Sequence, residues 1–461
     1  MIGSFQFKRF HDHFLLTNDF GRHVFLTEQE FKQFTANSID ENHPRFQELK
    51  DKLFLYTGSK EEYIRSTEEY YREYNGFLFE PTSLLIIALT NACNNHCVYC
   101  QANGSQHLST MTEAVADQII KRIDEMPSKY VTVEFQGGEP LICFDLIQYM
   151  ILQCEQKIKN KNIRFTLVSN LILLTEDMAD FFAAHSVSVS TSLDGPQSLH
   201  DKNRPSVSGI SSYEAVIQGK ALLDERHIFG GAIQTTTAYS LSYPREIVSL
   251  YKKLGLHQIF IRPLTRLGEA AKRWKEIGYS AEEYLAFYRS VTEEVINRNL
   301  HGEEITDYLL SLFLAKIYHG KSPNYMELRS PCGAGIGQIA FTANGNVYTC
   351  DEGRMVAETG DFSFQIGNVF ENGYEEWMNS PCNKAVCAAS VLEGSPGCHH
   401  CVYKPYCGVC PVVNYALNGN INSNARERCK IYEGILDMLF EYIYSKDPLI
   451  DQLFQKWSDT I

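Results

Sequence analysis

Short apolar runs alternate with longer amphipathic stretches through the middle of the chain. Runs rich in Val, Ile and Leu are typical of buried parallel strands, and apolar positions three or four residues apart are typical of the helices between them. The predicted strands cover residues 84–90, 130–136, 164–169, 187–193, 233–237 and 258–263. The predicted helices cover residues 112–126, 144–158, 176–185, 213–225 and 244–254. This alternation predicts an α/β fold of parallel βαβ units, fewer than the eight units of a closed barrel.

The two ends of the chain have different patterns. Short strands at 5–9, 13–17 and 23–26, followed by helices from Thr27 and near Pro44, predict a small winged-helix-like module. Amphipathic helices are predicted after the last central strand and again at the end of the chain. The predicted divisions are the module with a polar linking helix (1–80), the α/β domain (81–265), a helical bridge (266–330), a cysteine-rich domain (331–430) and a C-terminal helix (431–461).

The charge and composition of the chain exclude several classes of partner. The net charge of −14 disfavours a phosphate-rich ligand, so we expect no nucleic acid partner. The first residues lack the apolar core of a secretory signal, and no window approaches the roughly 18 apolar residues of a membrane span. These features predict a cytoplasmic protein with no membrane partner. In that compartment, the 14 cysteines point to metal binding or catalysis before disulfides.

Three cysteines, Cys93, Cys97 and Cys100, follow the first central strand at the spacing C-x3-C-x2-C. In a barrel of parallel strands, the loops that leave the strands carry the chemistry. A four-iron cluster is normally held by four thiolates, so three local cysteines would leave one iron open to a small molecule. The alternative is a zinc knuckle or three unrelated buried thiols, although zinc sites usually pair one C-x2-C with a second.

A second set of cysteines lies beyond Pro331. Its middle block has the spacing C-x2-C-x5-C-x2-C, which also suits a zinc ribbon. Zinc binding would explain this block, but it would not explain why the same chain also carries the cysteine loop at Cys93. Cys143 and Cys154, in contrast, lie in a predicted helix region of the α/β domain and are expected to be ordinary buried thiols. The seven cysteines of the set are Cys332, Cys350, Cys398, Cys401, Cys407, Cys410 and Cys429.

The cysteine loop and the stretch Gly137-Gly138-Glu139, which follows the second strand, together resemble the signature of the radical S-adenosylmethionine (radical SAM) superfamily. The resemblance implies a partial (β/α)6 TIM-like barrel and a [4Fe-4S] cluster on the three loop cysteines. It also implies that the open iron binds S-adenosylmethionine and that one electron cleaves this molecule to a 5′-deoxyadenosyl radical. Gly137, Gly138 and Glu139 would bind its amino group, because paired glycines permit close approach and a carboxylate accepts from an ammonium.

The resemblance assigns further cofactor-binding residues to the ends of the third and fourth strands. They would meet the ribose and the methionine carboxylate, although ordinary capping of strand ends would also explain each of them. The stretch from His200 to Arg204 is similar to a loop of related maturases, and Arg204 would either clamp a carboxylate or form a surface salt bridge. The assigned residues are Ser169, Asn170, Ser192 and Asp194.

The second set of cysteines resembles the SPASM domain, an extension of peptide- and protein-modifying radical SAM enzymes that carries two auxiliary [4Fe-4S] clusters. Three clusters are therefore expected in all. The pattern departs from the family in one place, because Cys407 and Cys410 are one residue closer than usual. The first auxiliary cluster has either an open iron or a fourth ligand from Cys382 or Cys387. The resemblance assigns Cys332, Cys350 and Cys410 to the first auxiliary cluster, and Cys398, Cys401, Cys407 and Cys429 to the second.

Asp351 directly follows Cys350 and is the expected catalytic residue. In similar sulfatase maturases, the aspartate at this place is the base that deprotonates the residue being oxidised. Chance placement beside the cysteine is the alternative.

These resemblances imply a radical SAM oxidoreductase that abstracts a hydrogen atom from a peptide side chain and installs a crosslink or an oxidation. The N-terminal module would add the leader of a ribosomal precursor peptide to a sheet edge, or it is only a structural appendage. A reducing partner such as flavodoxin or ferredoxin is also expected. Residues 15–18, 25–27 and 407–416 resemble the radical SAM maturases of His-Xaa-Ser repeat peptide systems. The alternatives are formylglycine-type sulfatase maturation and a non-catalytic zinc-binding scaffold.

Overall fold

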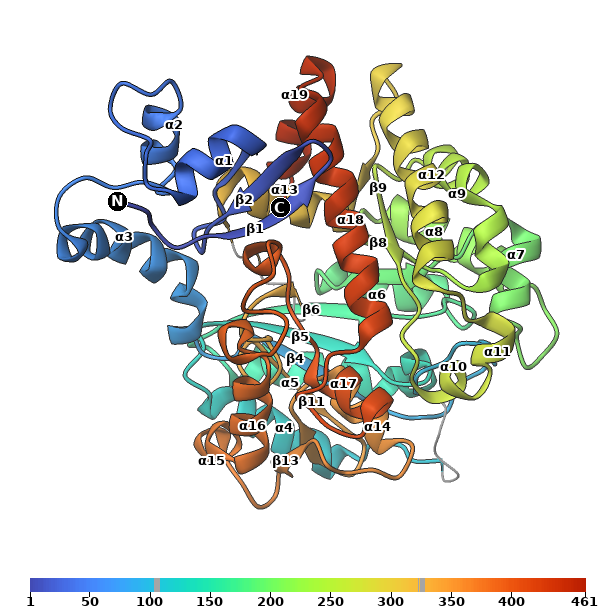
Figure 1. Cartoon of the computed structure of the whole chain (residues 1–461). Coiled ribbons are helices and arrows are strands. Elements are labelled where there is room, and N and C mark those ends of the chain that lie inside the picture. The colour runs from blue at the N-terminus through green and yellow to red at the C-terminus, as the bar shows by residue number, and fades with distance from the viewer. Residues whose placement is uncertain (103–107, 322, 324–327) are drawn as a thin grey trace.

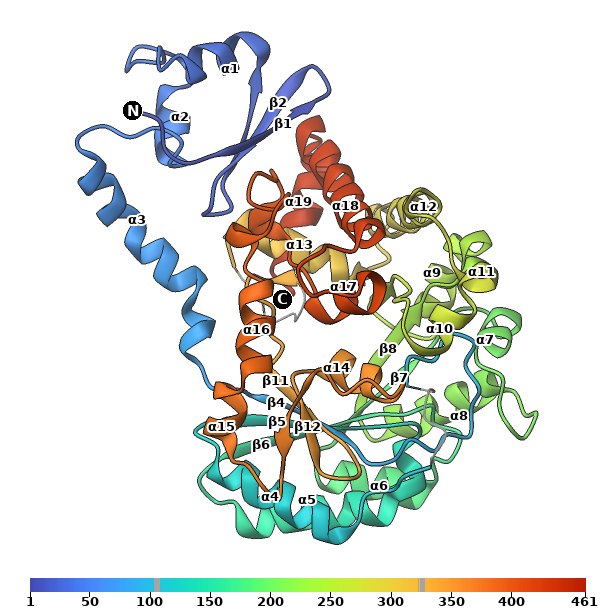
Figure 2. The same cartoon turned by 60° about the horizontal axis from the view of Figure 1, so that its bottom comes forward.

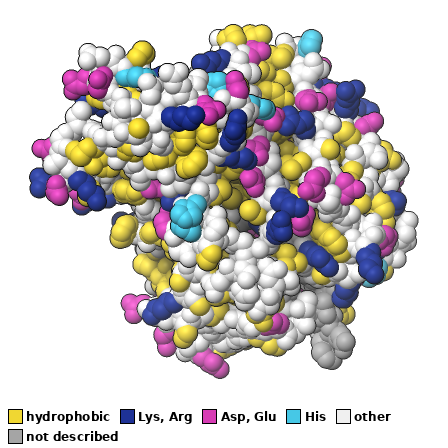
Figure 3. All heavy atoms as spheres, in the orientation of Figure 1, with side chains coloured by type: hydrophobic (Ala, Val, Ile, Leu, Met, Phe, Trp, Pro, Cys, Tyr) yellow, Lys and Arg dark blue, Asp and Glu magenta, His cyan; other side chains and the backbone are white. Residues whose placement is uncertain are grey.

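The computed structural model describes residues 1–102, 108–321, 323 and 328–461. A large α/β domain and a small N-terminal module lie at opposite ends of the molecule, and helices from the C-terminal part of the chain lie between them (Figures 1 and 2). On the face shown in Figure 3, Lys and Arg side chains are interspersed with Asp and Glu side chains rather than gathered in one area.

The predicted parallel strands are confirmed, and they lie side by side in chain order. The largest difference from the prediction is in β8, which begins four residues before the predicted start. Gly230 and Gly231 interrupt its apolar run, so the sequence pattern did not indicate a strand there. The strands are β4 (Leu84–Ala88), β5 (Tyr130–Gln136), β6 (Asn162–Val168), β7 (Ser188–Ser192), β8 (Phe229–Thr235) and β9 (Gln258–Arg262).

Helices cover the outer face of this sheet (Figure 2). Those predicted between the strands are confirmed as α4 (Glu113–Glu125), α5 (Phe144–Lys157), α6 (Glu176–Ala184), α8 (Ser212–Glu225) and α9 (Pro244–Lys253). The stretch from His200 to Arg204, expected as a loop, is instead mostly part of a helix, α7 (Gln197–Asn203). This helix is too short to show an apolar period in the sequence.

The sheet does not end with the six central strands. Strand β11 (Gln338–Phe341), from the cysteine region, pairs in parallel with β4, and β12 (Asn346–Tyr348) and β13 (Gln365–Asn368) continue the sheet in antiparallel fashion. At the other edge, the short β10 (Thr306–Asp307) pairs with β9. The cysteine region is therefore built onto the same ten-stranded sheet as the barrel. The sequence gives no sign of this pairing, because it joins segments about 250 residues apart.

The rest of the cysteine region is helical. Helix α14 (Asp351–Ala357) shares an apolar cluster with Ile86 of β4 and Ala340 of β11. It is followed by α15 (Tyr374–Asn379), α16 (Pro381–Ala389), a single turn η6 (Lys404–Tyr406) and α17 (Pro411–Asn418).

The N-terminal module has the predicted elements. Strands β1 (Gln6–Phe10), β2 (His13–Thr17) and β3 (His23–Thr27) form an antiparallel sheet, followed by α1 (Glu28–Thr35) and α2 (Phe46–Asp51). Helix α1 starts as expected, because Thr27 and Glu30 form a capping box. The polar linking helix is α3 (Lys60–Tyr74), and a short turn η1 (Gly76–Phe79) leads to the barrel.

The predicted bridge is mostly helical apart from β10 and its connecting segments, and residues 322 and 324–327 lie outside the described residues. It contains α10 (Gly268–Lys272), α11 (Trp274–Ile277), α12 (Ala281–Leu300) and α13 (Tyr308–His319). In place of the single C-terminal helix predicted over 431–461, the structure has two helices, α18 (Arg426–Ser445) and α19 (Pro448–Ser458). Among all the helices described, none is both long and apolar enough to cross a membrane.

Candidate functional site

A cavity of ≈ 320 Å³, here named the main cavity because it holds most of the predicted site residues, lies where the central strands end at their carboxyl side. Residues from the loops after several different strands line it, including nearly all those singled out by the sequence. The predicted residues that line it are Cys93, Cys97, Cys100, Gly137, Gly138, Glu139, Ser169, Asn170 and Ser192. The cavity is also lined by Tyr99, Arg204, Arg262, Arg354 and Met355.

The paired glycines lie directly under the cysteine loop. Gly137 has a φ of +146°, and a Cβ on it would lie 2.3 Å from the carbonyl oxygen of Thr90. A Cβ on Gly138 would lie 2.1 Å from the carbonyl oxygen of Ala92. The N–H groups of Gly138 and Glu139 donate to these two oxygens at 2.7 and 2.8 Å. Close backbone approach is therefore needed here as expected, and the chain that approaches is the protein's own cysteine loop.

Glu139 is 1% exposed, and its carboxylate is held by three hydrogen bonds. Ser169 Oγ donates to Oε1 at 2.7 Å, the Asn170 N–H donates to Oε2 at 2.8 Å, and the Leu141 N–H donates to Oε1 at 3.0 Å. Burial raises the pKa of Glu139, and these hydrogen bonds oppose that rise. Ser169 and the backbone of Asn170 thus fix a carboxylate in the cavity wall, where it suits a cationic ligand.

The three loop thiols face the same cavity and lie close enough to one another to interact electrostatically. Burial raises the pKa of Cys93 to about 11 and that of Cys97 to about 12. The Asn95 N–H donates to Cys93 Sγ at 3.4 Å. No fourth cysteine is among the described residues that line the cavity. The donor set therefore fits a four-iron cluster with one iron left for another ligand.

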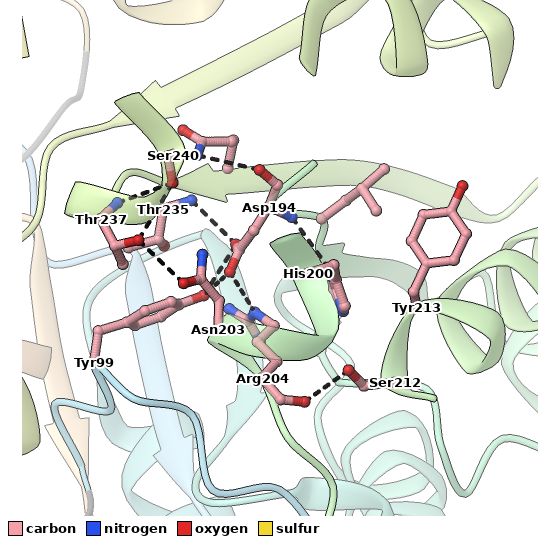
Figure 4. Close-up of polar contacts among 12 residues, drawn as sticks. Tyr99, Asp194, His200, Asn203, Arg204, Ser212, Tyr213, Thr235, Thr237 and Ser240 are labelled. Carbon is pink, nitrogen blue, oxygen red and sulfur yellow. Dashed lines mark hydrogen bonds and ion pairs between the residues drawn. The ribbon is translucent and has the colours of Figure 1, made fainter. Parts of the chain in front are cut away.

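Asp194 is not among the residues that line the cavity, and its side chain points toward Tyr99 and Arg204 (Figure 4). Its carboxylate is fully buried and accepts hydrogen bonds from Tyr99 Oη at 2.7 and 3.0 Å and from the Thr235 N–H at 3.3 Å. Arg204 Nε lies 3.4 Å from Asp194 Oδ2 in a buried ion pair. Tyr99 and Arg204 both line the cavity, so Asp194 contacts two wall residues instead of facing a cofactor.

Helix α7 contacts Asp194 and so helps to hold the same wall. The Asp194 N–H donates to His200 Nδ1 at 3.2 Å, in the tautomer that leaves this nitrogen unprotonated. Burial lowers the pKa of His200 to about 4, so the ring is neutral near pH 7. Arg204 follows α7 directly and pairs inward, so the expected surface salt bridge is a buried one.

The cysteines of the C-terminal region fall into two groups in space. Cys332, Cys350 and Cys410 share one buried apolar cluster. Cys398, Cys401, Cys407 and Cys429 surround a separate cavity of ≈ 160 Å³, which Cys410 also borders. This is the division that the resemblance implied, although Cys410 follows Cys407 closely in the sequence.

Further side chains complete the second group. Burial raises the pKa of Cys407 to about 12 and that of Cys429 to about 11. Asn424 Nδ2 donates to Cys398 Sγ at 2.9 Å. Four thiols around one cavity, one of them already accepting an amide N–H, fit a fully ligated four-iron cluster.

Cys382 and Cys387 both lie on α16. Cys382 packs against the first group, and its Sγ donates to the carbonyl oxygen of Ser363 at 3.2 Å. Cys387 Sγ lies 4.0 Å from the carbonyl oxygen of Ala334. Cys143 and Cys154 are buried in the core between the sheet and its outer helices, as ordinary thiols would be.

Asp351 is not among the cavity residues. It is the first residue of α14, and its Oδ1 accepts from Arg354 Nε at 2.8 Å and from Nη2 at 2.6 Å. Arg354, three residues further along the helix, is buried and lines the main cavity with Met355. Helix α14 thus runs from Cys350 of the first group to the cavity. Sequence reasoning missed Arg354, and its helical spacing from Cys350 is the one signal that could have found it.

The grouping of side chains bears on the zinc alternative. Within the part of the chain that the structure describes, no three His, Cys, Asp or Glu side chains are grouped as the ligands of a single metal ion would be. A zinc ion draws its ligands to about 2.3 Å, whereas a four-iron cluster takes each thiolate on a separate iron.

The chain is similar to known proteins in sequence. A family model described as the radical SAM superfamily matches residues 87–237. An uncharacterized protein of Synechocystis sp. is 30% identical over 368 residues, which cover 76% of this chain and 89% of that protein. The serine-type anaerobic sulfatase-maturating enzyme of Bacteroides thetaiotaomicron is 22% identical over 402 residues, covering 81% of this chain and 93% of that enzyme.

The fold is also similar to solved structures. Native anSMEcpe with bound AdoMet superposes with a TM-score of 0.70 at 20% identity, covering 82% of this chain and 100% of that chain. Streptococcus suis SuiB bound to precursor peptide SuiA superposes with a TM-score of 0.55 at 15% identity, covering 92% of this chain and 98% of that chain. The likeness to SuiB therefore includes a part of this chain that the likeness to anSMEcpe leaves out.

Proposed function

Because the chain belongs to the radical SAM superfamily, an enzyme superfamily, we propose that it is a radical enzyme that modifies a side chain of a precursor peptide. The observation that carries this proposal is the main cavity, where three thiols face Glu139 and the glycine pair. A four-iron cluster on Cys93, Cys97 and Cys100 would pass one electron to S-adenosylmethionine, and the carbon radical so formed would remove a hydrogen atom from the peptide.

The chain's own residues bind and orient this cofactor. Glu139 accepts hydrogen bonds from the ammonium of the methionine moiety, and burial strengthens that attraction. Arg204 is the cation for its carboxylate, and the hydroxyl of Ser192 lies in the same wall. Asp194 keeps Arg204 and Tyr99 in place and is a positioning residue.

The two C-terminal cysteine groups are proposed to hold the auxiliary clusters. Cys398, Cys401, Cys407 and Cys429 would fully ligate one of them. Cys332, Cys350 and Cys410 would hold the other, and Cys382 is the favoured fourth ligand because it packs against that group. These clusters would take up the electron that the substrate radical gives away, and a flavodoxin or ferredoxin would supply electrons to the loop cluster.

The N-terminal module is proposed to bind the leader of the precursor peptide as an added strand. The Asn18 N–H donates to Arg22 O, so the backbone carbonyls of His23 and Phe25 point away from β2, at the outer edge of β3. Lys52 Nζ and Arg45 Nη2 already donate to these two carbonyls, at 3.0 and 2.6 Å. The edge of β3 is therefore occupied by the module's own side chains.

The opposite edge of the sheet is β1, which is better suited to an added strand. By the same register, Phe7 and Arg9 turn their backbone groups outward. In the described part of the chain, no hydrogen bond outside the β1–β2 ladder joins the backbone of either residue. Phe7 is 51% exposed and offers an apolar contact to the incoming strand. We therefore assign the leader to β1.

Sulfatase maturation is the second candidate. The similarity to the serine-type anaerobic sulfatase-maturating enzyme favours it, since this chain covers 93% of that enzyme. In that reaction Asp351 would take a proton from the serine or cysteine being oxidised. The carboxylate is linked to the main cavity through Arg354.

Anaerobic reconstitution followed by product analysis tests these proposals. The full chain should bind about twelve irons, and replacing Cys93, Cys97 and Cys100 by alanine should remove about four of them. Co-expression with the precursor peptide encoded beside the gene should yield 5′-deoxyadenosine and a peptide lighter by two hydrogens. A sulfatase-derived peptide converted to formylglycine in its place would favour the second candidate. A colourless protein that binds zinc and no iron would contradict both.

A further inference from the structure

Two cations of the chain are buried near the C-terminal cysteine groups, outside the main cavity. Lys316 lies on α13 and is 1% exposed, and Arg329 lies just before Cys332 and is 2% exposed. The two are linked, because Lys316 Nζ donates to the carbonyl oxygen of Leu328, the residue before Arg329. No chemical role was predicted for the bridge that contains them.

Lys316 lies on α13, a helix whose apolar residues share one cluster with Cys401 and Cys407 of the second cysteine group. Helix α13 packs against η6, which directly precedes Cys407. Burial lowers the pKa of Lys316 to about 8; Cys407, once ionised as a cluster ligand, would favour the ammonium, and Arg329 opposes it. No carboxylate of the described residues forms an ion pair with Lys316.

Arg329 has a similar setting at the first cysteine group. Its guanidinium stacks on the ring of Phe77, 4.1 Å from the ring centre, and its Nε has no hydrogen-bond partner among the described residues. The Cys332 thiolate is the leading favourable charge acting on it, ahead of Glu80. Arg329 is thus a buried cation whose main anionic neighbour is a cysteine.

Other buried cations of this protein have carboxylate partners. Arg354 lies 2.6 Å from Asp351, and Lys404 Nζ lies 2.7 Å from Asp19. A buried ion without a counter-charge is costly, so Lys316 and Arg329 need an anion at close range. Cys407 acts electrostatically on Lys316 and Cys332 acts on Arg329, and as cluster ligands these cysteines would supply the negative charge.

We propose that Lys316 and Arg329 compensate the charge of the auxiliary clusters and thereby favour their reduced forms. Lys316 serves the group of Cys398, Cys401, Cys407 and Cys429, and Arg329 serves the group that contains Cys332. This inference rests on the proposed function, because it takes clusters to be present in both groups. Reduction adds one electron and hence one negative charge to a cluster, with no bond formed or broken. A fixed cation nearby stabilises that added charge.

Potentiometric titration of the reconstituted full chain tests the proposal. Dithionite supplies the electrons, and electron paramagnetic resonance reports each reduced cluster. The titration is repeated in a chain whose Cys93, Cys97 and Cys100 are alanine, so that only the auxiliary clusters contribute. Lys316→Met should shift the reduction equilibrium of one auxiliary cluster at least about tenfold toward the oxidised form, a fall of about 59 mV for one electron. Arg329→Met should shift the other.

The controls separate charge from structure. Lys316→Arg keeps the positive charge, so the reduction potential of its auxiliary cluster should stay close to the wild-type value. Lys430→Met removes an exposed lysine next to Cys429, which pairs with Glu282 and Glu427 and should shift neither cluster. An iron-replete Lys316→Met chain with an unchanged potential would overturn the proposal, as would an equal shift in Lys430→Met.

The loading of iron decides the remaining outcomes. If Lys316→Met fails to hold its cluster while Lys316→Arg holds it, the charge is required and the proposal stands. If both fail, Lys316 acts through packing and the proposal falls. A wild-type chain that loads only the loop cluster would instead contradict the auxiliary clusters of the proposed function, and this inference with them.

Discussion

The buried pair of Asp194 and Arg204 offers a sharp test of how the cavity wall is held. Asp194→Asn keeps the shape of the side chain but removes its charge, so Arg204 is left buried without a counter-ion. At the observed 3.4 Å, and with an effective dielectric constant of about 20, the lost attraction is about 5 kcal/mol. Removing one partner of a buried pair costs about 3–5 kcal/mol in proteins, which agrees. We expect that loss in the local opening free energy of β7 and α7.

Native-state hydrogen exchange of the full chain, followed by mass spectrometry over residues 188–204, measures this opening free energy. Arg204→Met and the double variant complete a double-mutant cycle, and the double variant should lose less than the sum of the single losses. Asp117→Asn is the matched control, because Asp117 pairs with Lys157 at 3.5 Å and both side chains are about half exposed. It should cost less than about 1 kcal/mol. An Asp194→Asn loss no larger than that of the control would refute the reasoning.

Four further variants test other parts of the site and fold. Glu139→Gln should raise the dissociation constant of S-adenosylmethionine about 10- to 100-fold in calorimetry, because it removes a charged hydrogen-bond acceptor. Gly138→Ala should lower the iron content by about four per chain, since its Cβ would meet the carbonyl oxygen of Ala92 at 2.1 Å. Arg9→Pro should weaken precursor-peptide binding at least about tenfold in fluorescence anisotropy, by removing an outward N–H, whereas Arg9→Ala should not. Burial raises the pKa of Asp307 to about 7 from 3.8, so the folded chain binds the extra proton between these values and its stability should fall as pH rises from about 4 to about 7. Asp307→Asn should remove that fall in melting temperature.

Matched controls accompany these variants. Gly394→Ala should leave the iron content unchanged, because a Cβ there has open space around it. Glu113→Gln, in the exposed first turn of α4, should leave cofactor binding unchanged. Equal effects of control and test variants, or a pH profile of Asp307→Asn that matches the wild type, would contradict the assigned roles.

Local sequence patterns predicted much of the fold, and contacts between distant segments account for what they missed. The run from Leu84 to Leu89 is apolar without interruption, so its strand could be placed from the sequence. The start of strand β8 was predicted four residues too late, because two consecutive glycines are typical of a turn. The pairing of β11 with β4 could not be predicted, since hydrogen bonding between backbones leaves no mark on the side chains involved.

The same distinction applies to the site residues. The spacing of the loop cysteines and the glycine pair placed them at neighbouring strand ends, and the structure brings them into one cavity. Asp194 also stands at a strand end, yet its side chain turns toward Tyr99 and Arg204. Side chains alternate between the two faces of a strand, and the sequence alone did not show which face Asp194 would take once β7 had ended.

The position of α14 limits how Asp351 can act as a base. Arg354 donates twice to Oδ1, so Oδ2 is the carboxylate oxygen that these hydrogen bonds leave for a substrate proton. Arg354 reaches the cavity from the same helix, whereas Asp351 stays outside its lining. A substrate residue bound in the cavity would contact Arg354, and this guanidinium would orient Asp351, the proposed base. Arg354→Lys should then impair turnover of the peptide more than it impairs cleavage of S-adenosylmethionine, whereas equal losses would place Arg354 with the cofactor alone.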